Sequence, residues 1–156
     1  MGIISSYTEQ DVYFMQQALK AAECAALQNE VPVGAVLVQN DTIIATAHNA
    51  PISQCDPTAH AEILAIRQGA QLLNNYRLID CTLYVTLEPC CMCIGAIIHA
   101  RIARLFYAAF DQKSGCVSSH LQLLDQPFLN HRVKHIGGIE EKASCTLLRN
   151  FFTARR

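Results

Sequence analysis

The sequence of 156 residues has no tryptophan and few charged side chains, which make up only 16% of it. Because 51% of the residues are hydrophobic, the composition excludes a disordered chain, and the length suits a single domain over residues 1–156. No lysine or arginine precedes Lys20, so the basic start of a secretory signal is missing. No uncharged apolar run is as long as a membrane helix requires. We therefore expect a cytoplasmic protein with no membrane association.

Disulfide bonds are not expected either, although the chain contains eight cysteines. Without an export signal, the reducing cytosol keeps thiols free. Five of the eight stand alone among apolar residues, where a free cysteine usually acts as a small buried hydrophobe. These five are Cys24, Cys55, Cys81, Cys116 and Cys145.

Basic residues are almost absent from the first part of the chain. Residues 1–60 hold one basic and six acidic residues, a net charge of -5, whereas residues 100–156 hold nine basic and four acidic residues, a net charge of +5. The simplest interpretation is scattered charge on a solvated surface. The alternative is that basic residues of the final third neutralise the phosphates of a nucleic acid. The candidates are Arg132, Lys134, Arg149, Arg155 and Arg156.

The spacing of apolar residues predicts an alternation of helices and strands. Helices are predicted over residues 9–28, 58–72, 91–100 and 139–154, and strands over 33–38, 42–47, 81–87, 102–108 and 133–137. The connection over 109–132, with a short helical piece near 121–124, suits a crossover to a parallel strand. We therefore expect an α/β protein with three layers (α/β/α), a five-stranded mixed sheet having helices on both faces. The helix over 91–100 is apolar on nearly all sides, so it should be buried on nearly every side.

One cluster of residue types carries chemistry. Cys90 and Cys93 follow a predicted strand directly and begin a helix, whose N-terminus favours thiolates. Such a pair alone is ambiguous, because it also occurs in redox proteins and structural zinc sites. With His60 the set has three donors, which leaves the fourth tetrahedral position of a zinc ion open to water, as in catalytic sites. A structural zinc site or a redox dithiol remains the alternative.

Glu62 is the candidate acid and base beside this metal. Zinc-activated water can attack a ring carbon that bears an amino group, and a single carboxylate can move the protons that loss of ammonia requires. Asp56 and Pro57 are predicted to open the helix over 58–72, which places His60 and Glu62 in its first turns. The i, i+2 spacing does not place them on one helix face, so an ordinary carboxylate at a helix N-terminus remains possible.

The strings around these residues resemble one family over nearly the whole chain. They are EVPVGAVLV (30–38), DPTAHAE (56–62), NYRLID (75–80), TLYVTLEPCCMC (82–93) and NHRV (130–133). They include the H-x-E and P-C-x-x-C signature of zinc nucleobase deaminases. The chain is similar to the bacterial tRNA-specific adenosine deaminases of the cytidine/deoxycytidylate deaminase superfamily. The resemblance implies a cytidine-deaminase-like fold, a homodimer, one zinc per chain, and hydrolysis of adenosine to inosine at the wobble position of a tRNA anticodon.

The same resemblance implies roles for individual residues. His60, Cys90 and Cys93 match the zinc ligands, and Glu62 matches the proton shuttle. Contacts with the anticodon stem-loop are implied for Asn49, Ala61, Asp111, Lys113, Phe151, Phe152 and Arg155. Two of these assignments have structural alternatives, since Asn49 could be a turn residue before Pro51 and paired phenylalanines on a terminal helix are often core residues.

Two other functions stay open at this point. A deaminase of free nucleosides or bases would use the same zinc chemistry, although the long connection over 109–132 and the basic final helix count against it. A non-catalytic zinc module that binds RNA would not need Glu62 beside an open metal position. The chain departs from the family pattern at Cys91, Ala100 and Ala108, none of which is a proposed ligand.

Overall fold

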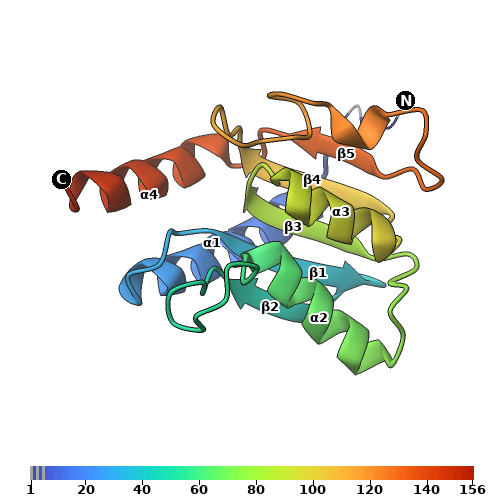
Figure 1. The fold of residues 1–156 in the computed structure, drawn as a ribbon, viewed down its shortest axis with the longest axis horizontal. Helices are drawn as coiled ribbons and strands as arrows, with labels where there is room; N and C mark the ends of the chain where they lie inside the picture. Colours follow the sequence, from blue (N-terminus) through green and yellow to red (C-terminus); the bar gives the residue numbers. More distant parts are fainter. Residues whose placement is uncertain (1, 3, 5) are drawn as a thin grey trace.

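The computed structural model describes residues 2, 4 and 6–156 (Figure 1). Helices and strands alternate along this part of the chain. In order they are α1 (Glu9–Leu27), β1 (Gly34–Gln39), β2 (Thr42–His48), α2 (Ala61–Leu73), β3 (Thr82–Leu87), α3 (Cys91–His99), β4 (Arg104–Ala109), the short 3-10 helix η1 (Leu123–Asp125), β5 (Lys134–Gly137) and α4 (Glu141–Thr153). Among the described residues, no helix combines the length and the apolar character needed to cross a bilayer.

The five strands form one mixed sheet in the order β2-β1-β3-β4-β5. Strand β1 is antiparallel to β2 and β3, while β3, β4 and β5 run parallel to one another. The hairpin between β1 and β2 closes through Asn40 and Asp41, both left-handed with φ of 50° and 60°, a two-residue turn whose twist matches that of the strands. The connection over 109–132 leads to a parallel strand, as expected.

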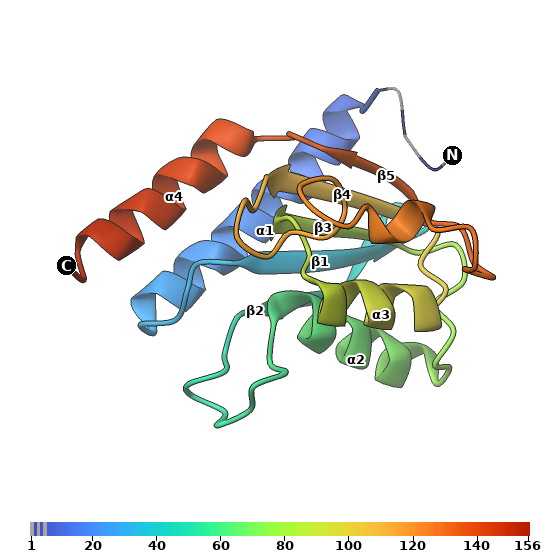
Figure 2. The same ribbon diagram turned by 45° about the horizontal axis from the view of Figure 1, so that its top comes forward.

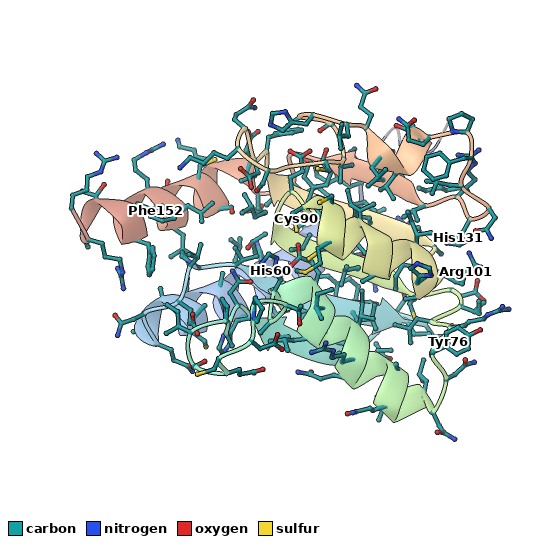
Figure 3. The ribbon with its side chains drawn as sticks, viewed as in Figure 1. His60, Tyr76, Cys90, Arg101, His131 and Phe152 are labelled. Carbon is teal, nitrogen blue, oxygen red and sulfur yellow. The ribbon has the colours of Figure 1, made fainter. Side chains whose placement is uncertain are left out.

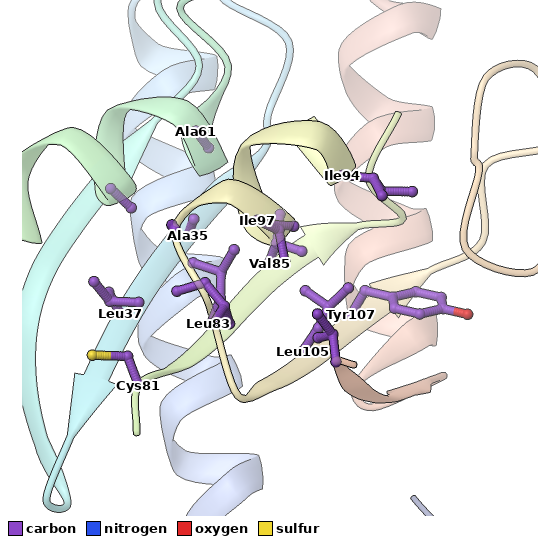
Figure 4. Packing of buried hydrophobic residues seen from close by; sticks show 14 of the residues in the cluster. Ala35, Leu37, Ala61, Cys81, Leu83, Val85, Ile94, Ile97, Leu105 and Tyr107 are labelled. Atoms are coloured by element: carbon purple, nitrogen blue, oxygen red, sulfur yellow. The ribbon is translucent and has the colours of Figure 1, made fainter. Parts of the chain in front are cut away.

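Alternating side chains of the sheet separate two apolar cores. Ala35 and Leu37 of β1 belong to the core under α2 and α3, which Figure 4 shows from close by. Val36 and Val38 belong to the opposite core, with Phe14 of α1. Figure 2 shows α2 and α3 on one face of the sheet and α1 on the other, where α4 also begins. The expected three-layer α/β/α arrangement with a five-stranded mixed sheet is therefore confirmed.

Helix α3 differs from the prediction that it would be buried on nearly every side. Its inner face is buried through Cys93, Ile94, Ile97 and Ile98. The opposite face, made of Cys91, Met92, Gly95, Ala96 and His99, is partly or fully exposed. The reason is geometric: α3 packs on the sheet and beside α2, and no described segment of this chain covers the remaining face.

The prediction that the five isolated cysteines are buried is confirmed for some of them and wrong for others. Cys81 and Cys116 are buried and Cys145 is half-buried, but Cys24 and Cys55 are exposed. Cys24 lies on the solvent-facing side of α1, and Cys55 lies in the loop that follows β2. Apolar neighbours in the sequence therefore did not determine burial, because the orientation of each side chain decides it.

Candidate metal centre

The starts of α2 and α3 converge on one site. His60 is the N-cap residue of α2, and Cys90 is the N-cap residue of α3. Figure 3 shows the two side chains close together between these helix starts. Each helix N-terminus carries a partial positive charge, which favours a thiolate at this position. The fold therefore brings together residues that lie 30 positions apart in the sequence.

The start of α2 corrects one prediction. The helix begins at Ala61, and Asp56 does not cap it, because its Oδ1 accepts hydrogen bonds from the amide and the hydroxyl of Thr58 at 2.8 and 2.7 Å. This local turn keeps residues 57–60 out of the helix. His60 has an extended backbone, with φ of -74° and ψ of 151°. Since His60 lies outside the helix, the i, i+2 spacing no longer argues against a shared site with Glu62.

The distances between the three donors fit a tetrahedral zinc ion. Nδ1 of His60 lies 3.7 Å from Sγ of Cys90 and 3.5 Å from Sγ of Cys93. Zinc bonded to sulfur and imidazole nitrogen at a tetrahedral angle separates those two atoms by about 3.6 Å. In the part of the chain that the structure describes, no other group of three or more metal-binding side chains meets at one point. Two thiols and one imidazole are the donor types that zinc prefers.

The protonation of the two thiols is uneven. A hydrogen bond from Cys93 lowers the pKa of Cys90 to about 4, even though burial acts in the opposite direction. The same hydrogen bond, together with burial, raises the pKa of Cys93 above its usual range. The hydrogen bond to Cys90 also raises the pKa of His60. Because a metal ion requires a thiolate at Cys93 and a neutral His60, zinc binding would release protons and would strengthen as pH rises.

Glu62 lies in the same pocket and is almost completely buried, with 4% of its surface exposed. Burial raises the pKa of Glu62 to about 7, against the opposing effects of its own backbone amide and of His60. A carboxyl group whose pKa lies near neutrality can both accept and donate a proton during a reaction. This environment differs from that of an ordinary exposed glutamate at a helix N-terminus.

The pocket has a volume of about 210 Å³ and two loops form its walls. Its lining residues are Val31, Val33, Asn49, Pro51, His60, Glu62, Leu87, Glu88, Cys90, Asp111 and Ser114. One wall comes from the loop after β2 and the other from the loop after β4. The pocket lies beyond the C-terminal ends of the parallel strands β3 and β4, where α/β sheets usually bind ligands.

The first wall is held by two side chains. Oδ1 of Asn49 accepts a hydrogen bond of 2.8 Å from the amide of Ala61 and so caps α2, which has no cap from the His60 side chain. The buried carboxylate of Glu30 accepts bonds from the amides of Ile52 and Ser53 at 3.2 and 2.9 Å. Asn49 thus caps α2 and also lines the pocket, a structural role different from that of the turn residue considered for it.

The remaining predicted RNA contacts lie at different distances from this pocket. Asp111 lines it, whereas Lys113 of the same loop is exposed and does not. On α4, Phe151 is 8% exposed and Phe152 is 49% exposed, so the core alternative holds for only one of the pair. Figure 3 shows Phe152 on α4, away from His60.

The side chain of Arg155 binds to other residues of this chain. Its guanidinium carbon lies 3.5 Å from the centre of the Phe151 ring. Its two terminal nitrogens donate to the carbonyl of Phe151 at 3.1 Å and to Oδ1 of Asn29 at 2.9 Å. These bonds join the end of α4 to the end of α1 and leave less of this side chain available to a ligand.

Sequence reasoning missed Glu30 and Glu88 as residues of the site. Glu88 stands in the string TLEPCCMC, two residues before Cys90, where it served only as part of a motif. A carboxylate between apolar strand residues and a proline is the signal that could have identified it, since buried charges need partners.

Known proteins share this fold and much of this sequence. The family model for the cytidine and deoxycytidylate deaminase zinc-binding region matches residues 8–109. The chain is 46% identical over 150 residues to the tRNA-specific adenosine deaminase of Haemophilus influenzae, covering 96% of this chain and 87% of that relative. A solved structure from a study of A-to-I editing by tRNA:A34 deaminases at the wobble position gives a TM-score of 0.85 at 44% identity, over 87% of this chain and 99% of the other. The guanine deaminase of Bacillus subtilis gives a TM-score of 0.61 at 31% identity, over 92% and 95% of the two chains. The cytidine-deaminase-like fold expected from the sequence is confirmed.

Proposed function

The chain belongs to the tRNA-specific adenosine deaminases of the cytidine and deoxycytidylate deaminase family, and from this premise we propose that it converts adenosine to inosine at the wobble position of a tRNA anticodon by zinc-dependent hydrolysis. The observation that carries the proposal is a set of three donors at zinc-like distances beside a buried carboxylate in one pocket. His60, Cys90 and Cys93 would hold the one zinc ion of each chain.

The proposed mechanism assigns the proton transfers to Glu62. When bound, zinc activates a water molecule as the nucleophile for the amino-bearing carbon of the base. Glu62 would accept one proton from the attacking water and pass it to the ring nitrogen. It would then take the remaining proton from the newly added hydroxyl group and deliver it to the amine, which leaves as ammonia while the carbonyl of inosine forms. One water is consumed, and adenosine becomes inosine. Asn49, whose Oδ1 is held by the amide of Ala61, would orient the base through its side-chain NH₂ group.

A polynucleotide substrate is favoured over a free base by features outside the pocket. Two of the three proteins named above, including the one with the higher TM-score, are tRNA adenosine deaminases by name, whereas the third is a guanine deaminase with lower structural similarity. The final third of this chain also carries a net charge of +5. Asp111 and Lys113 would border the anticodon loop. Phe152 presents an exposed ring on which a base can stack, supported by the edge of Phe151 at a centroid distance of 5.3 Å.

The substrate can be identified by comparing four compounds. We expect an anticodon stem-loop with adenosine at the wobble position to react far faster than the same adenosine in a duplex, because the base must leave its stack and a loop makes this easier. Free adenosine and free guanine should react poorly, since they lack every phosphate contact. Ammonia release is measured for each at equal concentration. Comparable turnover of either free compound would contradict the proposed substrate.

Salt dependence tests the basic end of α4. Arg149 and Arg156 are exposed, and we expect their joint replacement by Gln to weaken stem-loop binding and to reduce the slope of log K against log salt by up to about 2. Arg155 is left in place because it bonds to Asn29 and Phe151. The control is Arg77→Gln, beside Tyr76 at the end of the molecule far from His60 (Figure 3). If the double variant and the control have equal slopes, these two arginines do not contact phosphates.

We also propose that the protein acts as a homodimer in the cytoplasm, where its tRNA substrate is found. Supporting this, the outer face of α3 is open and made largely of small and apolar residues. A side-chain carbon added at Gly95 would meet nothing within 4 Å, so a second copy can approach this helix closely. An isologous contact between two such faces would bury them in both chains.

A further inference from the structure

Glu88 is a buried carboxylate with no role in the mechanism above. It is 2% exposed, and its amide donates to the carbonyl of Ala109 at 2.8 Å, which extends the pairing of β3 with β4. It directly precedes Pro89 and Cys90. Any segment that Glu88 holds is therefore held at a fixed distance from the metal centre.

The segment that Glu88 holds is residues 111–119, called here the 111–119 loop. Oε1 of Glu88 accepts hydrogen bonds from the amides of Val117, Ser118 and Ser119 at 3.0, 2.7 and 2.9 Å. Its Oε2 accepts from the amide of Asp111 at 3.0 Å and from the hydroxyl of Ser119. Successive backbone amides around one anion form a nest. The loop is thus wrapped around a single carboxylate.

Two further observations show how tightly the loop is wrapped. A side-chain carbon added at Gly115 would collide with the carboxylate of Glu88 and would lie 2.6 Å from the carbonyl oxygen of Asp111. The carbonyl of Pro89 accepts a hydrogen bond of 3.0 Å from the amide of Cys116. Both the main chain and the side chain beside Cys90 therefore bind the loop, and Gly115 is the residue that permits this approach.

We infer that Glu88 is a positioning residue that sets the place of Asp111 against the metal centre and thereby the affinity for the anticodon loop. This inference rests on the proposed function, because Asp111 and Ser114 of the loop line the pocket. Although Glu88 also lines the pocket, both of its carboxylate oxygens accept hydrogen bonds from the 111–119 loop, so it acts through the loop. Its loss should therefore raise KM and leave kcat and the zinc content nearly unchanged.

The variant Glu88→Gln should remove the hydrogen bond at the start of the loop and keep those at its end. The amide oxygen of Gln can still accept the three amides at the Oε1 position, while its NH₂ group replaces Oε2. The hydroxyl of Ser119 can turn to accept from that group, but the amide of Asp111 loses its acceptor. A hydrogen bond to a charged group is strong, so we expect KM for the anticodon stem-loop to rise about tenfold and kcat to change less than about threefold.

Hydrogen exchange of backbone amides gives a second readout that does not depend on activity. In Glu88→Gln the amide of Asp111 should exchange faster, while those of Val117 and Ser119 stay protected. The matched control is Ser118→Ala on the same loop. This variant loses the 2.6 Å contact between the Ser118 hydroxyl and the Tyr107 hydroxyl of β4 and keeps every bond to Glu88. Its KM should stay within about threefold of wild type.

Several outcomes would overturn the inference. A fall in kcat or loss of zinc with KM unchanged would mean that Glu88 supports only the metal motif, and wild-type KM would mean that the loop does not need it. If Glu88→Gln does not fold, Gly115→Ala displaces the loop from an intact carboxylate and should raise KM in the same way; an unchanged KM there contradicts the inference. Failure of the proposed function appears differently, as no deamination by the wild type, and exchange at Asp111 then still tests the role of Glu88.

Discussion

Replacing Glu62 by Gln is expected to lower kcat for the anticodon stem-loop by at least ~10²-fold, the usual contribution of a positioned acid or base. The amide keeps the shape of the side chain but cannot take a proton from water or deliver one to the base. Since Glu62 is not among the three proposed metal donors, zinc content and fold should be unchanged. The measurements are single-turnover rates, metal analysis and circular dichroism on the same preparation.

The control for Glu62→Gln is Glu9→Gln, which alters another glutamate in the first turn of a helix, at the start of α1. If Glu62 only stabilised the N-terminus of α2, both variants would lose about 0.3–1 kcal/mol of stability and neither would lose activity. We expect the rate to fall for Glu62→Gln alone. Activity within about threefold of wild type would remove Glu62 from the mechanism.

Cys93→Ala is expected to remove the zinc ion and with it all detectable deamination. Cys93 is fully buried at the meeting point of the three donors, so no other thiol can take its place without moving α3. Losing one of three protein ligands leaves two, which is too few for a stable catalytic zinc site. His60→Ala and Cys90→Ala should have the same result. Zinc per chain is measured after dialysis against metal-free buffer, together with activity.

The matched control is Cys91→Ala, because Cys91 lies in the same helical turn but is exposed. This variant should keep one zinc per chain and wild-type activity. Unchanged zinc after Cys93→Ala, or two ions per wild-type chain, would contradict the ligand assignment. Loss of zinc from Cys91→Ala would instead place this third thiol in the metal site.

The layers of the fold could be predicted from sequence because the apolar spacing is regular there. Strand β1 alternates Ala35 and Leu37 with Val36 and Val38, and the structure places these pairs in opposite cores. The predicted first residue of α2 was wrong because a short-range hydrogen bond between Asp56 and Thr58 competes with helix capping by Asp56. The open face of α3 could not be seen from composition, since an apolar helix does not reveal what covers it.

The donor set of the metal centre followed from motif spacing, whereas the carboxylates that hold its walls did not. Glu88 bonds to Ser119, 31 positions away, and this pairing depends on the path of an irregular connection that has no periodicity. Phe151 and Phe152 are neighbours in the sequence, and only the rotation of α4 about its axis decides that the first is buried. Long-range hydrogen bonds and helix rotation are the two properties that the sequence left open.

Incubation of the wild-type protein with total tRNA, followed by sequencing, shows whether the protein deaminates the wobble adenosine, because inosine is read as guanosine. We expect adenosines newly read as guanosine at the wobble position of anticodons after incubation with the wild-type protein, and none after incubation with Glu62→Gln. No conversion at that position, conversion at scattered adenosines in paired regions, or equal conversion by Glu62→Gln would contradict the proposed function.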